Sequence, residues 1–148
     1  DGSVRESIAQ GRIGVKIEEG IPMEKYLYDT KAYDSSLELK NINTSIDEVI
    51  VYGKIPRNSI AIPTITGESY SPDFMYVVKK DNGEKELNIV VETKGVENKS
   101  TLRGIEEAKI QCAKVFFNNL SAQGYNVYFR TQLNNKKILQ IVKDVLQE

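Results

Sequence analysis

The chain has 148 residues, enough for one domain with a sizeable hydrophobic core. Hydrophobic residues make up 40% and charged residues 28%, which is typical of an ordinary globular domain. The net charge of −1 argues against a protein that coats nucleic-acid phosphates broadly, although a local basic patch beside an acidic metal site would not change this total. There is no run of about 18 apolar residues and no apolar leader. Because the chain opens at Asp1 without an initiator methionine, we expect a piece of a longer protein.

Two residue counts narrow the possible chemistry. The sequence has no histidine, which excludes Ser-His-Asp and Cys-His catalysis and every histidine-ligated zinc site. Carboxylates, lysine and tyrosine remain available, together with hard cations that prefer oxygen ligands. The single cysteine, Cys112, excludes an internal disulfide and favours a cytoplasmic location.

The predicted strands are short and spread along the chain. In chain order they are 12–17, 48–55, 60–65, the two arms of a hairpin around 81–83, and 125–132. The strand at 60–65 contains Pro63 and is therefore expected at the edge of a sheet. Between 18 and 25 the sequence is irregular, because a glycine and a proline interrupt it, and 66–72 is expected to form a loop.

Three segments have helical character. The first is expected to begin at Asp34, Ser35 or Ser36, and Ser35 and Glu38 stand at the spacing of a capping box. The second covers 101–120 and ends before Gly124, and the third closes the chain. Their predicted apolar sides consist of Leu102, Ile105, Ala108, Cys112, Val115 or Phe116, and Leu120 for the second helix, and of Ile138, Ile141, Val142 and Val145 for the third. Strands and helices in this order predict a mixed sheet flanked by helices.

The segment SPDFMYVVKKDNGEKELNIVVETKG at 71–95 predicts a β-hairpin with a definite register. DNG at 81–83 is a strong type I′ turn signal, and a turn centred on Asn82-Gly83 pairs positions whose numbers sum to 165. A one-residue slip would mix the two faces of the hairpin, so the hydrophobic pattern supports this register. One face then pairs Phe74 with Val91, Tyr76 with Ile89 and Val78 with Leu87, and the other pairs Lys79 with Glu86, Val77 with Asn88 and Met75 with Val90.

Three ionisable residues converge at one end of this hairpin. The same register places Asp73 opposite Glu92, with Cβ atoms roughly 5 Å apart, and Lys94 lies on the same side as Glu92. Two carboxylates this close repel each other unless a proton or a cation intervenes, and carboxylates with backbone carbonyls suit Mg²⁺. With Lys94, they are the minimal equipment for metal-assisted phosphodiester hydrolysis. The alternative is a surface salt-bridge cluster at a frayed strand end, and the spacing alone leaves both interpretations open.

The surrounding segments resemble one family. They are YDSSLE at 33–38, GKIPRNSIAIPTITGESYSPDFMYVV at 53–78, IVVETKG at 89–95 and IEEAKIQCAKVFF at 105–117. In this order and spacing they resemble the C-terminal nuclease domain of type III restriction endonuclease Res subunits. The resemblance implies a PD-(D/E)xK nuclease, with an α/β fold in which a restriction-endonuclease-like α/β/α sandwich surrounds a central mixed β-sheet.

Roles follow from the resemblance residue by residue. In that family the Asp of PD and the Glu of E-x-K bind Mg²⁺, for which Mn²⁺ can substitute, and the Lys positions or activates the attacking water. Here these residues are Asp73, Glu92 and Lys94, and the Thr93 carbonyl is an implied further ligand. Many members add an acid from a helix before the sheet, and Glu38 matches it. Its alternative role is simply that of the capping-box acid.

Four residues are weaker candidates for DNA contact. Lys54 and Arg57 in GKIPR stand where a DNA phosphate could be held. Lys109 and Gln111 lie on the helix that follows the E-x-K strand, where members of the superfamily often place groups near the site. Ordinary solvated charge is the alternative for Lys54, Arg57 and Lys109, and it is the preferred interpretation for the two lysines.

The resemblance also implies a larger assembly. Residues 33–148 would form the nuclease domain, and residues 1–32 an N-terminal arm leading from a helicase region that this chain lacks. Because no G-x-x-x-x-G-K-[ST] loop is present, ATP would act only through that region. The expected function is Mg²⁺-dependent endonucleolytic cleavage of double-stranded DNA, with a methyltransferase (Mod) subunit recognising the sequence. A repair or recombination nuclease of the same fold, and a non-catalytic DNA-docking or scaffold domain, are the alternatives.

Overall fold

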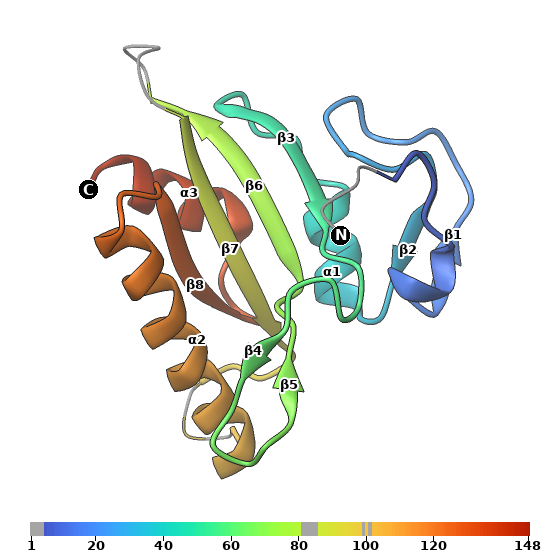
Figure 1. The fold of residues 1–148 in the computed structure, drawn as a ribbon. Helices are drawn as coiled ribbons and strands as arrows, with labels where there is room; N and C mark the ends of the chain where they lie inside the picture. The colour runs from blue at the N-terminus through green and yellow to red at the C-terminus, as the bar shows by residue number, and fades with distance from the viewer. Residues whose placement is uncertain (1–4, 81–85, 99, 101) are drawn as a thin grey trace.

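A four-stranded sheet forms the centre of the computed structural model, which describes residues 5–80, 86–98, 100 and 102–148. Its strands follow the order β3-β6-β7-β8 (Figure 1). β6 pairs antiparallel with β3 and β7, whereas β8 runs parallel to β7, so the predicted mixed sheet is confirmed. The strands are β3 (Val49–Lys54), β6 (Phe74–Lys79), β7 (Glu86–Lys94) and β8 (Val127–Leu133).

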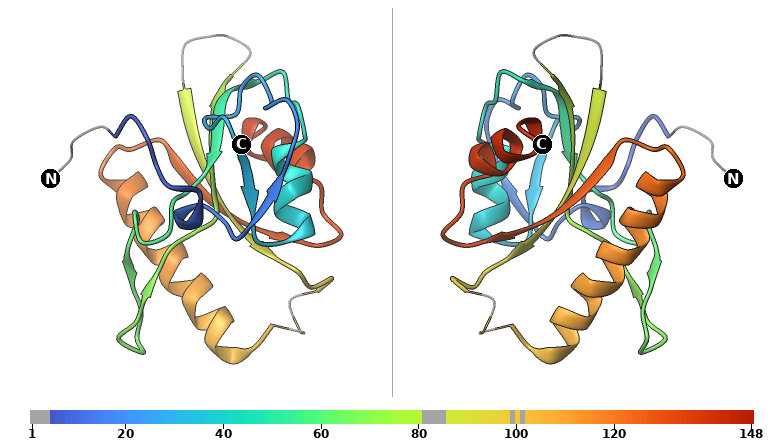
Figure 2. Two further views of the ribbon diagram at one scale, coloured as in Figure 1. Left: turned by 90° about the vertical axis from the view of Figure 1, so that its right-hand side faces the viewer. Right: turned by 90° about the vertical axis from the view of Figure 1, so that its left-hand side faces the viewer.

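Helices cover both faces of this sheet (Figures 1 and 2). α1 (Ser36–Ile42) and α3 (Ile138–Leu146) pack on one face, while α2 (Gly104–Ala122) and the small hairpin of β4 (Ile62–Pro63) and β5 (Ser69–Tyr70) pack on the other. The predicted α/β/α sandwich is therefore confirmed. The predicted apolar side of the closing helix is confirmed as well, because its four residues are all buried in the core: Ile138, Ile141, Val142 and Val145. None of the described helices is both long enough and apolar enough to cross a membrane.

The pairing of β6 with β7 follows the predicted register. The ladder runs from Phe74 opposite Val91 to Lys79 opposite Glu86. The face predicted to be apolar is buried against α1 and α3. The turn predicted at Asn82-Gly83 lies outside the described residues.

The segment before α1 folds back onto the sheet. It contains the 3-10 turn η1 (Gln10–Arg12), β1 (Lys16–Glu18) and β2 (Lys31–Tyr33), and β1 pairs antiparallel with β2. The strand predicted at 12–17 therefore begins later than expected. The residue at position 14, just before β1, has to be glycine, because a Cβ there would lie 2.5 Å from the backbone nitrogen of Tyr33. Tyr26 is buried and forms a parallel bridge with Tyr52 of β3, which ties this segment to the central sheet.

Two expectations about local structure are wrong. The loop predicted at 66–72 contains β5, whose Tyr70 pairs with Ile62 of β4. The predicted apolar side of α2 is also rotated, because Ile110, Ala113 and Phe117 are buried in the core, while Ile105 and Val115 are exposed. Apolar residues occupy two neighbouring sides of this helix, so their spacing does not say which side meets the sheet.

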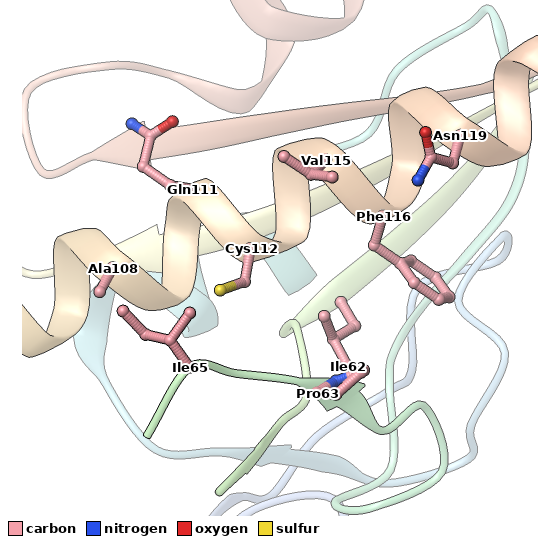
Figure 3. Close-up of a pocket in the computed structure, with 9 residues that line it drawn as sticks. All are labelled: Ile62, Pro63, Ile65, Ala108, Gln111, Cys112, Val115, Phe116 and Asn119. Atoms are coloured by element: carbon pink, nitrogen blue, oxygen red, sulfur yellow. The ribbon is translucent and has the colours of Figure 1, made fainter. Parts of the chain in front are cut away.

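The second apolar side of α2 borders a groove. Cys112, Val115 and Phe116 line a cavity of about 520 Å³ between α2 and the β4–β5 hairpin (Figure 3). Ile62, Pro63 and Ile65 line it from the hairpin side.

Two stacked tyrosines connect the sheet to α1. The rings of Tyr52 and Tyr76 are parallel, with centroids 5.3 Å apart. The hydroxyl of Tyr52 donates to the carbonyl of Ile42 in α1. The hydroxyl of Tyr76 is buried and has no hydrogen-bond partner in the described part of the chain. The Tyr52 hydroxyl therefore stabilises the folded state, whereas the Tyr76 hydroxyl does not, although the two rings are neighbours.

Removing each hydroxyl as Tyr→Phe is expected to give opposite results. Tyr52→Phe should lower the free energy of unfolding by about 1 kcal/mol, because it removes a satisfied hydrogen bond. Tyr76→Phe should leave it unchanged or raise it by up to about 1 kcal/mol, because it removes an unsatisfied buried hydroxyl. Denaturant unfolding of both variants measures the difference. An equal loss in the two variants would contradict this account.

Candidate active site

The candidate site lies where β6 begins and β7 ends, at one edge of the central sheet. Asp73 directly precedes β6, and Glu92, Thr93 and Lys94 are the last residues of β7. The regular ladder stops at Phe74–Val91, and the N–H of Asp73 donates to the carbonyl of Val91 at 3.2 Å. Asp73 thus lies beside the end of β7, but the regular Asp73–Glu92 pair expected from the sequence is not part of the ladder.

Thr93 holds the Asp73 carboxylate. Its backbone N–H and its hydroxyl both donate to Oδ2 of Asp73, at 2.8 and 2.7 Å. The sequence indicated only the Thr93 carbonyl as a candidate ligand, and nothing in the local pattern points to the hydroxyl. The two bonds give the Asp73 side chain a defined direction at the edge of the sheet.

Glu92 is the most unusual acid in the described structure. The residue is 5% exposed, and its Oε1 lies 3.0 Å from Nζ of Lys94. Its Oε2 is buried and accepts no hydrogen bond of ordinary geometry from the described residues. Burial and then the charge of Asp73 raise the pKa of Glu92 to about 8, against the opposing effect of Lys94. In the absence of a cation, this carboxylate therefore favours its protonated form around neutral pH.

Tyr70 and Glu106 border the same site and were not predicted. The buried Tyr70 hydroxyl forms no hydrogen bond of ordinary geometry with the described residues, yet its polar interaction with Glu92 lowers the pKa of that acid. Burial and then the Glu92 charge raise the pKa of Tyr70. Glu106, in the first turn of α2, lies 4.0 Å from the largely buried ammonium of Lys94. Tyr70 stands three residues before Asp73, a spacing that could have indicated it, whereas Glu106 belongs to α2, which sequence spacing does not place near the hairpin end.

A second cluster of charges surrounds Lys54. This residue is 3% exposed, and its ammonium lies 2.5 Å from Asp34 and 3.1 Å from Glu38. The guanidinium of Arg57 lies 2.6 Å from the other oxygen of Asp34. The interpretation of Lys54 as a solvated surface charge is therefore wrong. Because its ammonium is bound to two carboxylates in the interior, we do not retain Lys54 as a phosphate contact.

Glu38 caps α1 and also lies near the candidate site, so its position is compatible with both of the roles considered for it. The capping box of α1 is present, since Glu38 N–H donates to Ser35 Oγ at 3.2 Å and Glu38 Oε2 accepts from Ser35 N–H at 3.2 Å. No described residue donates to its other oxygen, Oε1. Burial and then the charge of Asp73 raise the pKa of Glu38, so the cap also lies within electrostatic reach of the candidate site.

A polar cavity opens beside Asp73. Its volume is about 280 Å³, and Asp34, Lys54, Arg57 and Asp73 are among the residues that line it. Arg57 is the exposed residue among these four, whereas Lys54 is buried and the two aspartates are half-buried. Lys109 and Gln111 lie on α2 and do not join this cluster. Lys109 pairs with Glu68 at 3.5 Å, and Gln111 lines the apolar groove shown in Figure 3.

The donor set at the sheet edge fits a hard divalent cation. No three acidic, cysteine or histidine side chains gather closely enough to enclose a metal ion within the described ranges. Asp73 and Glu92 nevertheless form a pair in which one buried carboxylate oxygen has no hydrogen-bond donor. Mg²⁺ is commonly bound by one or two carboxylates with other oxygen ligands. The residues present therefore suit Mg²⁺ or Mn²⁺ better than a softer metal.

Comparisons with known proteins identify the family of the chain. Residues 24–136 match the family model described as an endonuclease domain. The chain belongs to this endonuclease domain family. Membership implies a general requirement for a divalent metal, and it confirms the resemblance drawn from GKIPR, YSPDF and VETKG.

Three relatives match almost the whole chain. It is 43% identical over 148 residues to the type III restriction-modification enzyme EcoP15I Res subunit of Escherichia coli. It is 42% identical to the EcoPI Res subunit of Escherichia phage P1 and 28% identical to the StyLTI Res subunit of Salmonella typhimurium. The matches cover 97–99% of this chain but only 14–15% of each relative, so the chain spans about a seventh of their length. No solved structure gives a significant match.

Without a divalent cation, the stability of the protein is expected to fall as the pH rises from about 4.5 to about 8. The folded state keeps a proton on Glu92, with its pKa of about 8, whereas the unfolded state loses it near the ordinary value of 4.5. The folded state then binds more protons, so raising the pH favours unfolding, by an amount on the order of a few kcal/mol. Glu38 contributes in the same direction, because its pKa is also raised.

Thermal unfolding in EDTA at several pH values measures this effect. Glu92→Gln should remove much of the pH dependence and should raise the unfolding temperature at pH 8 more than at pH 5. Glu86→Gln is the matched control, since Glu86 is exposed at the other end of β7. The account fails if Glu92→Gln keeps the full pH dependence of the unsubstituted chain.

Proposed function

We propose that this chain is the DNA-cleaving domain of a type III restriction enzyme, and that it hydrolyses phosphodiester bonds of double-stranded DNA with Mg²⁺. The observation that supports this most directly is the buried Glu92 carboxylate, whose Oε2 has no hydrogen-bond donor among the described residues while Asp73 lies close enough to raise its pKa. Two carboxylates in this relation are stabilised by a cation between them. The family of the chain makes a nuclease the natural use for such a pair.

Asp73 and Glu92 would hold the cation, with the Thr93 carbonyl as a further ligand. When bound, it supplies positive charge for the phosphate group in the transition state and lowers the pKa of a nearby water. Thr93 contributes by fixing Asp73 through its N–H and hydroxyl. The burial of Glu92 reduces competition from solvent for the same carboxylate oxygens.

Lys94 would orient the attacking water. Its ammonium is held by Glu92 at 3.0 Å and lies 4.0 Å from Glu106, so it stays at the sheet edge instead of extending into solvent. An ammonium has three N–H donors, and those not engaged by Glu92 can bind a water or a phosphate oxygen. The water attacks phosphorus and gives up a proton to solvent, while the bond from phosphorus to the leaving sugar oxygen breaks and that oxygen takes a proton from solvent.

Arg57 is the proposed phosphate contact. Its guanidinium is exposed at the polar cavity that reaches Asp73, where it is held by Asp34. Glu38 would add negative charge near Asp73 and so raise the affinity for a cation. Phosphate contacts position a DNA substrate without reading its sequence. Recognition of the DNA sequence is therefore assigned to another part of the enzyme.

The proposed context is a longer Res-type protein. The relatives are named as Res subunits of type III restriction-modification enzymes, and the chain covers about 15% of the two that are more similar to it. We propose that a helicase region supplies the ATP-dependent step and that a methyltransferase subunit recognises the DNA sequence.

Replacing Asp73, Glu92 or Lys94 by Ala in the complete enzyme is expected to reduce DNA cleavage by at least about 10²-fold, since each removes a group acting on the reacting phosphate. ATP hydrolysis should persist. Lys79→Ala is the control, because Lys79 is exposed at the far end of β6. Cleavage at the unsubstituted rate by the Lys94→Ala enzyme would count decisively against the assignment.

Arg57→Ala is expected to weaken DNA binding and to reduce the slope of log affinity against log salt by about one, as expected for one lost phosphate contact. Binding is measured at several salt concentrations in the Lys94→Ala background, so that cleavage does not interfere. Lys143→Ala, an exposed change on α3, controls for net charge. A salt slope that is the same with and without Arg57 would exclude the contact.

A further inference from the structure

Two buried amides join α1 to β8 through reciprocal hydrogen bonds. Asn41 Nδ2 donates to Gln132 Oε1 at 2.6 Å, and Gln132 Nε2 donates to Asn41 Oδ1 at 3.0 Å. Gln132 Nε2 also donates to the Lys136 carbonyl at 2.9 Å. Both side chains belong to residues that are 1% exposed. Neither takes part in the chemistry proposed above.

Stability alone does not explain this pair. A hydrogen bond between two buried neutral groups contributes little net free energy, and replacing both partners by apolar groups of similar shape is often neutral. A reciprocal amide pair differs from an apolar contact in being directional, because it closes only at one distance and one relative orientation. What the pair adds to the core is therefore a defined position of α1 against β8.

The pair lies at the end of the sheet that carries the candidate site. Gln132 is paired in the parallel ladder with Thr93, the residue that donates twice to Asp73. Asn41 lies three residues after Glu38 on α1, about one turn further along the helix. The amide pair thus connects the helix that carries Glu38 to the strand that borders Thr93.

We propose that the Asn41–Gln132 pair is a positioning element of the active site, which sets α1, and with it Glu38, against the edge of the sheet that holds Asp73 and Glu92. This inference rests on the proposed function, because it assumes that a divalent cation binds at that edge. A change in the pair should then alter cation binding even where the fold persists. An ordinary core contact would affect stability alone.

The test replaces both amides by apolar side chains of similar shape, as Asn41→Leu with Gln132→Met, in the complete protein. Removing both partners avoids leaving one amide buried and unpaired, so circular dichroism should show an unchanged fold. Mn²⁺ binding is followed by electron paramagnetic resonance, and Asp73→Asn identifies the signal of this site. The variant with the apolar pair should bind Mn²⁺ about tenfold more weakly than the unsubstituted protein. The exchanged pair, Asn41→Gln with Gln132→Asn, should restore most of the affinity.

The decisive comparison uses Glu38→Gln. If the amide pair acts by placing Glu38, the apolar pair weakens Mn²⁺ binding no further in the Glu38→Gln background. Equal weakening in both backgrounds, or unchanged affinity in the folded apolar variant, overturns the inference. If the apolar variant does not fold, Gln132→Asn alone carries the same comparison, because it shortens the contact by one methylene and keeps the amide.

Failure of the proposed function would look different. In that case Asp73→Asn would leave all Mn²⁺ binding intact in the otherwise unsubstituted protein. The cation site would then be excluded, and the positioning role with it. Loss of the signal in Asp73→Asn, with no effect of the amide pair, would instead exclude the positioning role alone.

Discussion

The antiparallel pairing of β6 with β7 is the constraint on which the candidate site depends. It brings Asp73 beside the end of β7. After burial, the charge of Asp73 is the next cause that raises the pKa of Glu92, so the pairing keeps two carboxyl groups close together against their mutual repulsion. A slip of β7 by one residue would relieve this repulsion but would turn three apolar residues, Leu87, Ile89 and Val91, away from the buried face, each worth about 1.5–3 kcal/mol when buried. The hydrophobic core therefore outweighs the repulsion and keeps the acids in place.

Each of the two most buried acids has its own lysine, and the two pairs differ in what they leave free. Lys54 is enclosed by Asp34 and Glu38 and is satisfied within the protein. Lys94 meets Glu92 through one carboxylate oxygen, and the other oxygen keeps no donor among the described residues. Desolvation penalises the charged form of Glu92 more than Lys94 favours it. The site is thus short of positive charge where the family requires a metal.

Much of this arrangement could be predicted from local sequence patterns. The hairpin register, the Ser35–Glu38 capping box and the buried side of α3 all follow from the spacing of residues close in the chain. The burial of Lys54 and the clamp of Thr93 on Asp73 could not be predicted, because they depend on which elements meet in space. The rotated face of α2 has the same origin, since two sides of that helix are apolar and only the packed sheet selects one.

The carboxylate of Glu38 serves two purposes, because it caps a helix and sets the charge near the candidate site. Oε2 of Glu38 caps the first turn of α1. Burial and the charge of Asp73 also raise the pKa of this carboxyl group. Loss of this side chain would fray the helix and alter the charge near the candidate site together, so most substitutions at this position change both properties. Asparagine or aspartate at this position would be too short for the box, which leaves glutamine as the substitution that can separate helix capping from charge.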